Sequence, residues 1–367
     1  MPYVYCSISG YTGVMAKAAV EERVSLALYR KYRPGVFDDF RDQDQIVKVL
    51  EAAVAQQKIA HAYLFAGGRG TGKTSMARAL AHAVGTSDQD IYEMDAASNR
   101  GIDEIRELRD GVSTLPFEST YKFYIIDEAH ALTPQAWQAL LKTLEEPPSH
   151  AVFVLATTEL DRVPDTIISR CQTFKFKKPS HETLKKLSLD VAKKEGATLS
   201  PAGAELIALM GDGSFRDTLG ILQKVLTVSK DKTLSEEEVA AVVGAPSSVA
   251  VNDFLQALAR KDAGAAVEVF HTALQGGVEP KVFLLLVVTK VRSVLLLRFV
   301  PGLRKQFAEQ FSESDQAILA ELAGPAGAAI NANLLAELIT ALLEVAHAPI
   351  PAIPLELALY RVASPQA

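Results

Sequence analysis

The chain has 367 residues, 49% of them hydrophobic and 22% charged, which suggests two or three folded domains of roughly 150 residues and gives no indication of a disordered chain. Its formal net charge of −6 argues against a general electrostatic binder of nucleic acid, but leaves room for a local basic surface or for DNA contact through partner subunits. The two cysteines, Cys6 and Cys171, lie far apart, which excludes a disulfide framework and an all-cysteine zinc site and fits a reducing cytoplasm.

Residues 1–24 are expected to form a disordered N-terminal extension. The segment Met1–Gly13 has neither a cationic start nor an apolar stretch, so it is not a secretory signal. Met15 is a second plausible start, because the sequence from there runs directly into the first recognisable motif. Residues 1–14 are therefore either part of the extension or an over-called start.

Strand-like and helical segments alternate between Ala62 and Phe176. Each strand-like segment is short and apolar, and a helical stretch separates it from the next. The predicted strands are Ala62–Ala66, Ile91–Met94, Lys122–Ile126, Val152–Ala156 and Thr173–Phe176. This order predicts an α/β domain, residues 25–178, in which helices flank a mostly parallel sheet.

A glycine-rich run, Gly67-Gly68-Arg69-Gly70-Thr71-Gly72-Lys73-Thr74, follows the first predicted strand and opens a helix that continues to about Val84. It satisfies the P-loop pattern G-x-x-x-x-G-K-[ST], and its glycines allow several main-chain N–H groups to point at one anion. In that arrangement Lys73 reaches the β- and γ-phosphates, and the Thr74 hydroxyl ligates Mg²⁺. A glycine-rich turn can match the pattern by chance, but the flanking strand and helix favour binding of a nucleoside triphosphate.

The segment Phe123–His130 is an apolar strand that ends in two carboxylates. A carboxylate at the end of a strand beside a P-loop can hold Mg²⁺, often through water, and this role is predicted for Asp127. Glu128 follows directly, where it can orient or deprotonate an attacking water. Without the P-loop, an ordinary acidic turn would be the simpler interpretation. His130 completes a D-E-x-H string, and a loop histidine without chemistry explains it equally well.

After Pro179 the pattern is helical only. The helices predicted for a small lid, residues 179–244, are His181–Lys194, Pro201–Met210, Phe215–Thr227 and Ser235–Val243. Helical periodicity continues to the end of the chain and predicts an all-α region over residues 245–367. Within it, the apolar stretch Val282–Val300 is interrupted by three basic residues, which leaves too short a run for the ~20 apolar residues of a membrane span. We therefore expect a buried helix there and no membrane contact.

Several further motifs point to one family. They are Tyr29-Arg30-Lys31-Tyr32-Arg33-Pro34, Asp95-Ala96-Ala97-Ser98, the run Leu140–Pro148, Leu155-Ala156-Thr157-Thr158, Ile168-Ser169-Arg170-Cys171 and the run Gly213–Leu219. Together with the P-loop, they make the chain resemble the gamma/tau subunits of bacterial DNA polymerase III, the AAA+ ATPase motors of the replicative clamp loader. The resemblance is specific from Leu28 to Gly244. Over the C-terminal helices it rests only on length and class.

The resemblance implies roles for residues outside the two nucleotide motifs. Thr158 corresponds to sensor 1, which senses the γ-phosphate and the attacking water, and Arg216 corresponds to sensor 2, which contacts the nucleotide from the lid. Arg170 corresponds to an arginine finger that reaches the ATP of the neighbouring subunit, where a guanidinium stabilises charge on phosphate oxygens. A single arginine is usually a solvated surface charge, so these assignments depend on the surrounding motifs.

The same resemblance completes the expected site. It places Tyr32, Arg33, Pro34 and the Ile46–Leu50 stretch beside the adenine, Lys142 near the subunit interface, and Arg100 and Arg106 toward DNA. The expected nucleotide-binding set is Tyr32, Arg33, Pro34, Gly67, Gly68, Arg69, Gly70, Thr71, Gly72, Lys73, Thr74, Ser75 and Arg216. The expected catalytic set is Lys73, Asp127, Glu128, Thr158 and Arg170, and the expected Mg²⁺ ligands are Thr74 and Asp127.

The function that the resemblance implies is ATP-dependent loading of a sliding clamp onto primed DNA. It implies ATP and Mg²⁺, a cytoplasmic location, and a pentameric hetero-oligomer with delta and delta-prime types of subunit, in which residues 245–367 form an oligomerisation collar. The family is catalogued under DNA-directed DNA polymerase as part of the holoenzyme, and no polymerase active site is expected in this chain.

Two other classes stay open. A non-catalytic or paralogous clamp-loader subunit is opposed by the intact Lys73 and Glu128, since such subunits typically lose the P-loop. Another AAA+ DNA remodeller, such as a branch-migration motor or a replication factor C type of subunit, is opposed by the Asp95–Ser98 and Leu140–Pro148 motifs.

Two departures from the family pattern qualify the resemblance. The family usually carries a four-cysteine zinc module after the P-loop helix, but here Gly85–Asp90 joins the helix to the next strand without a cysteine, so no zinc is expected. The chain also ends at Ala367 without a long Pro- or Lys-rich tail, as in a short form of the family, although a divergent paralogue or a fragment would look the same.

Overall fold

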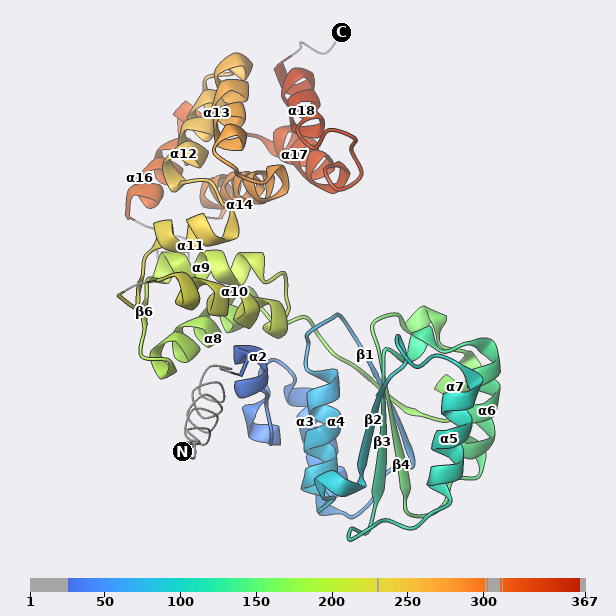
Figure 1. The fold of residues 1–367 in the computed structure, drawn as a ribbon. Coiled ribbons are helices and arrows are strands. Elements are labelled where there is room, and N and C mark those ends of the chain that lie inside the picture. Colours follow the sequence, from blue (N-terminus) through green and yellow to red (C-terminus); the bar gives the residue numbers. More distant parts are fainter. Residues whose placement is uncertain (1–25, 230, 301, 303–310, 312, 364–367) are drawn as a thin grey trace, which may run out of the picture.

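The computed structural model describes residues 26–229, 231–300, 302, 311 and 313–363. The predicted disordered extension, residues 1–24, lies outside the described residues. Figure 1 shows a sheet with helices on both sides at the bottom of the view, a small group of helices above it, and the C-terminal helices at the top. The first described helix, α2 (Leu28–Lys31), packs against the middle group, where Leu28 is buried.

The sheet has five strands in the order β2-β3-β4-β1-β5. The strands are β1 (Ala62–Ala66), β2 (Ile91–Asp95), β3 (Lys122–Asp127), β4 (Ala151–Thr157) and β5 (Gln172–Lys175). All neighbouring pairs are parallel, which confirms the predicted α/β class. Because β4 lies between β1 and β3, the loops that follow these three strands meet at one edge of the sheet.

Alternate residues of each strand pack on opposite faces of the sheet. On β1, Phe65 belongs to the core under α3 (Asp44–Ala55) and α4 (Lys73–Ala83), whereas Leu64 belongs to the core under the helices of the other face. Those helices are α5 (Ile102–Val112), α6 (Pro134–Glu145) and α7 (Asp165–Ile168). Burying each large apolar side chain contributes roughly 1.5–3 kcal/mol, so both layers hold the sheet edge in a fixed position.

The middle group corresponds to the predicted lid, and each of its helices begins with a serine cap. Its helices are α8 (His181–Lys194), α9 (Pro201–Met210), α10 (Phe215–Val228) and α11 (Glu236–Val243). The caps are Ser180, Ser200, Ser214 and Ser235, and each side-chain oxygen accepts a main-chain N–H three residues later. The last helix therefore begins at Glu236, one residue later than predicted.

The expectation of helices alone in this middle group is wrong in one detail. Two short strands, β6 (Thr198–Leu199) and β7 (Thr233–Leu234), pair in parallel beside the helices. Leu199 and Leu234 are buried in the core of the group. A strand of two residues has no periodicity that a sequence can reveal, so its formation depends on the packing of these leucines.

The C-terminal part of the described chain is helical and has its own core. Its helices are α12 (Ser248–Ala259), α13 (Ala263–Gln275), α14 (Pro280–Phe299), α16 (Glu313–Ala323), α17 (Ala332–Glu344) and α18 (Ile353–Ala363). The predicted buried helix is α14, whose residues Phe283, Val287 and Val294 are fully buried in this core. None of the helices in the described ranges has the length and apolarity needed to cross a membrane.

Short 3₁₀ turns connect several of these elements. They are η1 (Phe37–Asp39), η2 (Asp88–Asp90), η3 (Ala129–Ala131), η4 (Leu160–Arg162) and η6 (Pro325–Gly327).

Candidate nucleotide-binding site

The P-loop connects β1 to the N-terminus of α4, as the pattern predicts, and it also touches the lid. Gly67, Gly70 and Gly72 have φ angles of 155°, 69° and 100°, which favour glycine. The Gly70 carbonyl accepts the main-chain N–H of Phe215 at 3.0 Å. A Cβ on Gly70 would lie 2.0 Å from the Ser214 Oγ, so glycine is required for contact with the start of α10.

Lys73 is buried at the start of α4 with 6% of its surface exposed. Its Nζ donates hydrogen bonds to the carbonyls of Gly67 and Gly68, both at 2.8 Å. Burial lowers the pKa of Lys73, while the negative charges of Glu128 and Asp127 oppose that shift. The ammonium is thus held inside the loop by main-chain oxygens.

Asp127 and Thr74 bring two oxygen ligands together at the end of β3. The Thr74 Oγ1 donates a hydrogen bond to the Asp127 Oδ2 at 2.8 Å, and the Asp127 Oδ1 accepts the Glu128 N–H at 3.0 Å. Among the described residues, no group of three or more His, Cys, Asp or Glu gathers in the way a protein-only metal site requires. Mg²⁺ usually keeps several waters and takes one or two protein oxygens, so a hydroxyl and a carboxylate in contact fit this ion.

Glu128 stands next to the end of β4. Its φ of 48° lies in the left-handed region, which is unusual for a residue other than glycine. The Thr158 Oγ1 donates a hydrogen bond to the Glu128 Oε2 at 3.0 Å. The structure thus brings together the residues predicted as base and as sensor 1, because β3 and β4 are adjacent strands.

A cavity of about 950 Å³ opens between the P-loop, the α2 segment and the lid. This volume is at the upper end of the usual range for small-molecule sites. The predicted binding residues that line it are Tyr32, Arg33, Pro34, Arg69, Gly70, Thr71, Gly72, Lys73, Thr74, Ser75, Asp127, Glu128 and Arg216. Gly67 and Gly68 are not part of this lining, and they reach the site through their contacts with Lys73.

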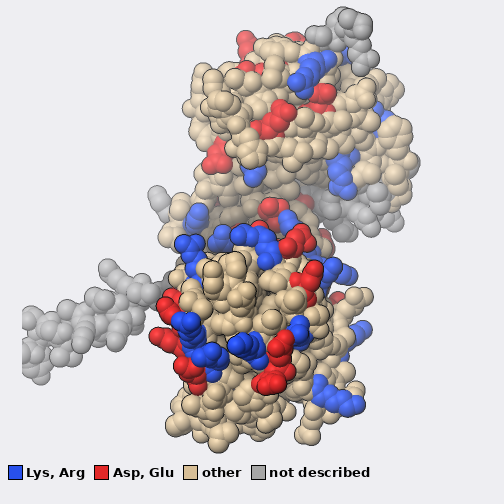
Figure 2. Space-filling model, turned by 90° about the vertical axis from the view of Figure 1, so that its right-hand side faces the viewer, with Lys and Arg blue, Asp and Glu red and all other residues tan. Residues whose placement is uncertain are grey.

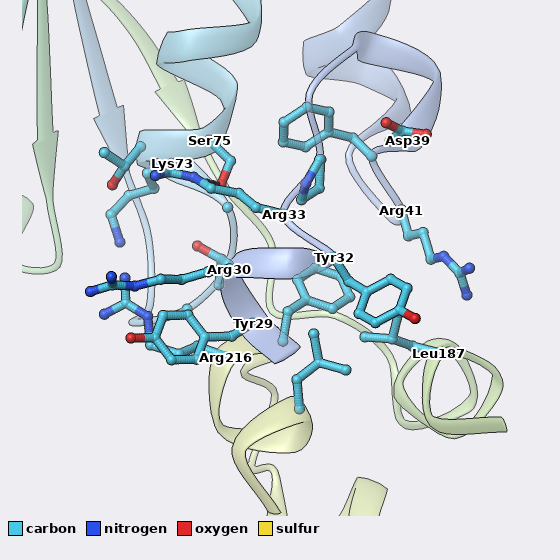
Figure 3. A pocket seen from close by; sticks show the side chains of 18 of the residues that line it. Tyr29, Arg30, Tyr32, Arg33, Asp39, Arg41, Lys73, Ser75, Leu187 and Arg216 are labelled. Carbon is cyan, nitrogen blue, oxygen red and sulfur yellow. Dashed lines mark hydrogen bonds between the residues drawn. The ribbon is translucent and has the colours of Figure 1, made fainter. Parts of the chain in front are cut away.

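The cavity has more basic residues than were predicted. Figure 3 shows the side chains of Arg30 and Arg216 beside one another, next to the Tyr29 ring. Their guanidinium carbons lie 5.8 and 5.7 Å from the centre of that ring. Arg41, Arg78 and Lys194 also line the cavity. Arg30 lies inside a motif that was quoted, whereas the others are brought in by folding from α4, α8 and the turn before α3.

The segment after α2 connects the lid to the P-loop helix. Arg33 Nε donates to the Ser75 Oγ at 2.9 Å, and the Tyr32 hydroxyl donates to the Glu195 carboxylate at the end of α8. Burial, followed by the Glu195 hydrogen bond and charge, raises the pKa of Tyr32 to about 12. Burial lowers the pKa of Arg33, although the carboxylate of Glu93 opposes this.

The Ile46–Leu50 stretch was expected to border the adenine, and this expectation is wrong. Ile46 and Leu50 are 7% and 0% exposed and pack in the core with Phe65 and Leu80. None of residues 46–50 lines the cavity. The apolar residues at positions i and i+4 of α3 face the sheet, because that face of the helix is the one that burial stabilises.

Arg170 lies away from the cavity of its own chain. Its guanidinium donates to the Glu145 Oε1 at 2.7 Å and to the Thr166 carbonyl at 2.6 Å, and 34% of the side chain is exposed. Lys142 is exposed on the same helix as Glu145. The contact with Glu145 was not predicted, although Glu145 lies within a motif that the sequence analysis quoted.

Arg100 and Arg106, expected to face DNA, are both exposed. Arg106 pairs with Asp103 at 3.1 Å. On the face that Figure 2 shows, basic and acidic side chains are intermingled on the lower part of the molecule, and the C-terminal helices at the top have few charges. That view shows no large patch of one sign.

Comparison with known proteins places the chain among DNA polymerase III subunits. Residues 42–100 and 85–180 match the family described as "DNA polymerase III, delta subunit", and residues 234–367 match "DNA polymerase III subunits gamma and tau domain III". The chain is 40% identical over 298 residues to DNA polymerase III subunit tau of Bacillus subtilis, covering 76% of this chain and 53% of the relative. It is 31% identical over 296 residues to subunit tau of Escherichia coli, covering 75% and 46%. The chain spans about half the length of these curated relatives.

Among solved structures, the fold is similar to the RuvB Holliday junction branch migration motor of Thermotoga maritima. The TM-score is 0.50 at 22% identity, and the match covers 62% of this chain and 78% of that one. At this identity the likeness concerns the fold alone.

Proposed function

The chain belongs to the gamma/tau family of DNA polymerase III subunits, and from this premise we propose that it is an ATP-driven motor subunit of a clamp loader. In this role it helps to load a sliding clamp onto primed DNA, with ATP binding and hydrolysis driving the cycle. The observation that carries the proposal is the meeting of Lys73, the Thr74–Asp127 pair and Glu128 at one edge of the sheet, in one cavity. A subunit without ATPase activity would have no need of all four.

We expect the chain's own residues to divide the work of binding. The N–H groups of the P-loop and the Lys73 ammonium bind the phosphates, and Arg216 contacts them from the lid. Thr74 and Asp127 hold Mg²⁺, which neutralises charge on the phosphate oxygens when it is bound. The Tyr32–Pro34 segment borders the base, since it lines the same cavity and connects to the lid.

Hydrolysis requires a group that orients and deprotonates water, and Glu128 is the carboxylate in place for this. General acid–base catalysis of this kind contributes about 10²- to 10⁴-fold. Thr158 holds the Glu128 carboxylate through its hydroxyl. Arg170 lies outside its own site, which supports a role in the site of a neighbouring subunit.

This arrangement supports an oligomer rather than a self-contained enzyme. We propose an AAA+ region over residues 25–178, a lid over 179–244 and a collar over 245–367, assembled with delta and delta-prime types of subunit into a cytoplasmic pentamer. Mg²⁺ and ATP are the proposed cofactor and substrate, and no polymerase chemistry is assigned to the chain.

A non-catalytic subunit of the same assembly is the main alternative. The intact hydrogen bond between Thr74 and Asp127 and the placed Glu128 speak against it. A branch-migration motor is less well supported, because the likeness to RuvB concerns only the fold.

The decisive experiment is a subunit-mixing assay of ATPase activity in the assembled complex, with clamp and primed DNA. Arg170→Ala should leave nucleotide binding intact and abolish most hydrolysis, since an arginine finger can contribute about 10³- to 10⁵-fold. Mixing Arg170→Ala with Lys73→Ala subunits should restore intermediate activity, because some neighbours then combine an intact P-loop with an intact finger. Absence of complementation at every mixing ratio, with assembly confirmed by sedimentation, would overturn the proposed mechanism.

A further inference from the structure

His130 lies where the turns after two adjacent strands meet. It follows β3 in η3, and its side chain is only 12% exposed. The imidazole Nδ1 is 3.1 Å from the Thr157 Oγ1 at the end of β4, and the Nε2 is 3.1 Å from the Glu159 Oε1. Both ring nitrogens therefore contact the turn after β4.

The turn that His130 holds also contains Thr158. The Thr157 Oγ1 accepts the Glu159 N–H at 3.0 Å, so the side chains around His130 brace the main chain on either side of Thr158. Thr158 in turn donates to the Glu128 Oε2, which is itself 3.5 Å from the His130 Nδ1. The contacts therefore form a closed network. Glu128 contacts Thr158, the side chains on either side of Thr158 contact His130, and His130 lies beside Glu128.

The chemistry of the partners fixes how this network works. An ionised Glu159 carboxylate can only accept, so the His130 Nε2 donates to it. The Thr157 hydroxyl can donate or accept, so it can bond to Nδ1 whether or not that nitrogen carries a proton. Two such bonds to a partly buried ring hold the turn after β4 at a fixed distance from the turn after β3.

We propose that His130 is a positioning residue for hydrolysis: through Thr157 and Glu159 it fixes Thr158, and Thr158 fixes the Glu128 carboxylate. Glu128 needs such support, because its left-handed main chain is held by its surroundings rather than by its own preference. Misplacing a reacting group by about 1 Å can cost as much as 10²-fold in rate. This inference rests on the proposed ATPase function.

The test compares His130→Phe with His130→Gln in the assembled complex. Phenylalanine keeps a ring of similar size without nitrogen atoms, whereas the glutamine amide can still donate to Glu159. We expect His130→Phe to lower kcat by about 10- to 100-fold, with little change in KM or in the affinity for a fluorescent ATP analogue. His130→Gln should recover most of the lost kcat.

Two further variants make the result specific. Glu159→Ala should also lower kcat. Combining it with His130→Phe should lower kcat little more than His130→Phe alone, because both variants remove the same contact, between His130 and Glu159. His82→Ala, at the exposed C-terminal end of α4, is the matched histidine control and should behave as wild type.

The outcomes separate this inference from the function on which it rests. Wild-type kcat in His130→Phe, together with an inactive Glu128→Gln, would overturn the role of His130 alone. Equal losses in kcat and in nucleotide affinity without rescue by glutamine would reduce His130 to a structural residue. Normal hydrolysis by Glu128→Gln would overturn both proposals, because Glu128 would then not be the base.

Discussion

Two buried lysines, one at the nucleotide cavity and one in the C-terminal helices, show how the same side chain serves different purposes. Lys73 is 6% exposed and Lys290 is 5% exposed. Burial lowers the pKa of both, and nearby carboxylates oppose the shift in both cases. By exposure and by charge environment they look alike.

Their hydrogen-bond partners separate them. Lys290 on α14 donates to side chains from two other helices: Asp315 at 2.9 Å, Ser248 at 2.9 Å and Asn252 at 2.8 Å. Asp315 also accepts from Asn252 and Ser248. This network joins α12, α14 and α16 and matches the three ammonium donors with three acceptors.

Lys73 is held by the main-chain carbonyls of its own loop instead. Its positive charge is close to Asp127 and Glu128, but its hydrogen bonds go to Gly67 and Gly68. The Lys73 ammonium can replace these hydrogen bonds with hydrogen bonds to a bound anion. The same exchange at Lys290 would break the contacts that join three helices. The lesson is that the identity of the partner, more than burial, distinguishes a binding lysine from a structural one.

The largest stability effect should come from breaking the Lys290 network. Asp315→Ala removes the carboxylate that is hydrogen-bonded to the buried Lys290 ammonium, and we expect a loss of about 3–5 kcal/mol in the free energy of unfolding by chemical denaturation. Asp315→Asn keeps an acceptor and should cost less. A loss in Asp315→Ala no greater than in Asp315→Asn would show that the charge of Asp315 is unimportant.

Replacing Lys73 should instead have a large effect on nucleotide binding and a small effect on stability. We expect Lys73→Ala to weaken nucleotide binding by at least about 100-fold, given the ~3 kcal/mol that a charge-assisted hydrogen bond can contribute. Its stability should change by less than about 1 kcal/mol. Equilibrium binding of a fluorescent ATP analogue measures the first effect, with the exposed Lys58→Ala as control. Unchanged affinity would remove the distinction between the two lysines.

Disturbing the contact between the P-loop and the lid should have a smaller effect on stability. Gly70→Ala combines a positive φ with a clash against Ser214, and we expect it to cost about 1–3 kcal/mol and to weaken nucleotide binding. Gly85→Ala is the matched control, because Gly85 has a φ of 81° but nothing within 4 Å of the added Cβ. Equal effects in the two variants would mean that the clash with the lid is relieved at no cost.

Asp90 is also a buried charged residue with main-chain partners. It therefore tests whether such partners are enough to identify a residue that binds a ligand. Asp90 is fully buried, and it accepts the N–H groups of Phe117, Glu118 and Ser119. Burial acts to raise its pKa, but these hydrogen bonds outweigh it and hold the pKa below its ordinary value. Asp90→Asn should cost about 1–2 kcal/mol at neutral pH and leave nucleotide binding unchanged.

The pH dependence of that variant follows from the direction of the shift. Because the pKa is lower in the folded chain, the carboxylate stabilises the fold above the unfolded pKa of about 4. This contribution is lost as the pH falls through the folded pKa, so wild type and Asp90→Asn should converge in acid. Denaturation at neutral and at acid pH measures this, with the exposed Asp88→Asn as control. A constant difference across pH would contradict it.

Local chemistry allowed much of the site to be predicted. The P-loop needs glycines for its left-handed main chain, and a buried strand needs alternating or continuous apolar residues, so both are visible in a few residues. For the same reason the five strands of the sheet, and the helices for which bounds were predicted, agree with the structure within about two residues at each end. The motif residues Lys73, Thr74, Asp127 and Glu128 do meet in one cavity.

Contacts between distant segments were not visible in this way. The sequence by itself determined which segments are strands, which loop turns around an anion, and which acidic residues follow a strand. Only the tertiary structure decided that Ile46 and Leu50 face the core, that Gly70 touches Ser214, and that His130 holds the turn after β4. The contact of His130 depends on the strand order, which places β4 beside β3. The periodicity of apolar residues shows only which face of a helix or strand is buried. The residues that pack against that face depend on how the elements are arranged in the whole fold.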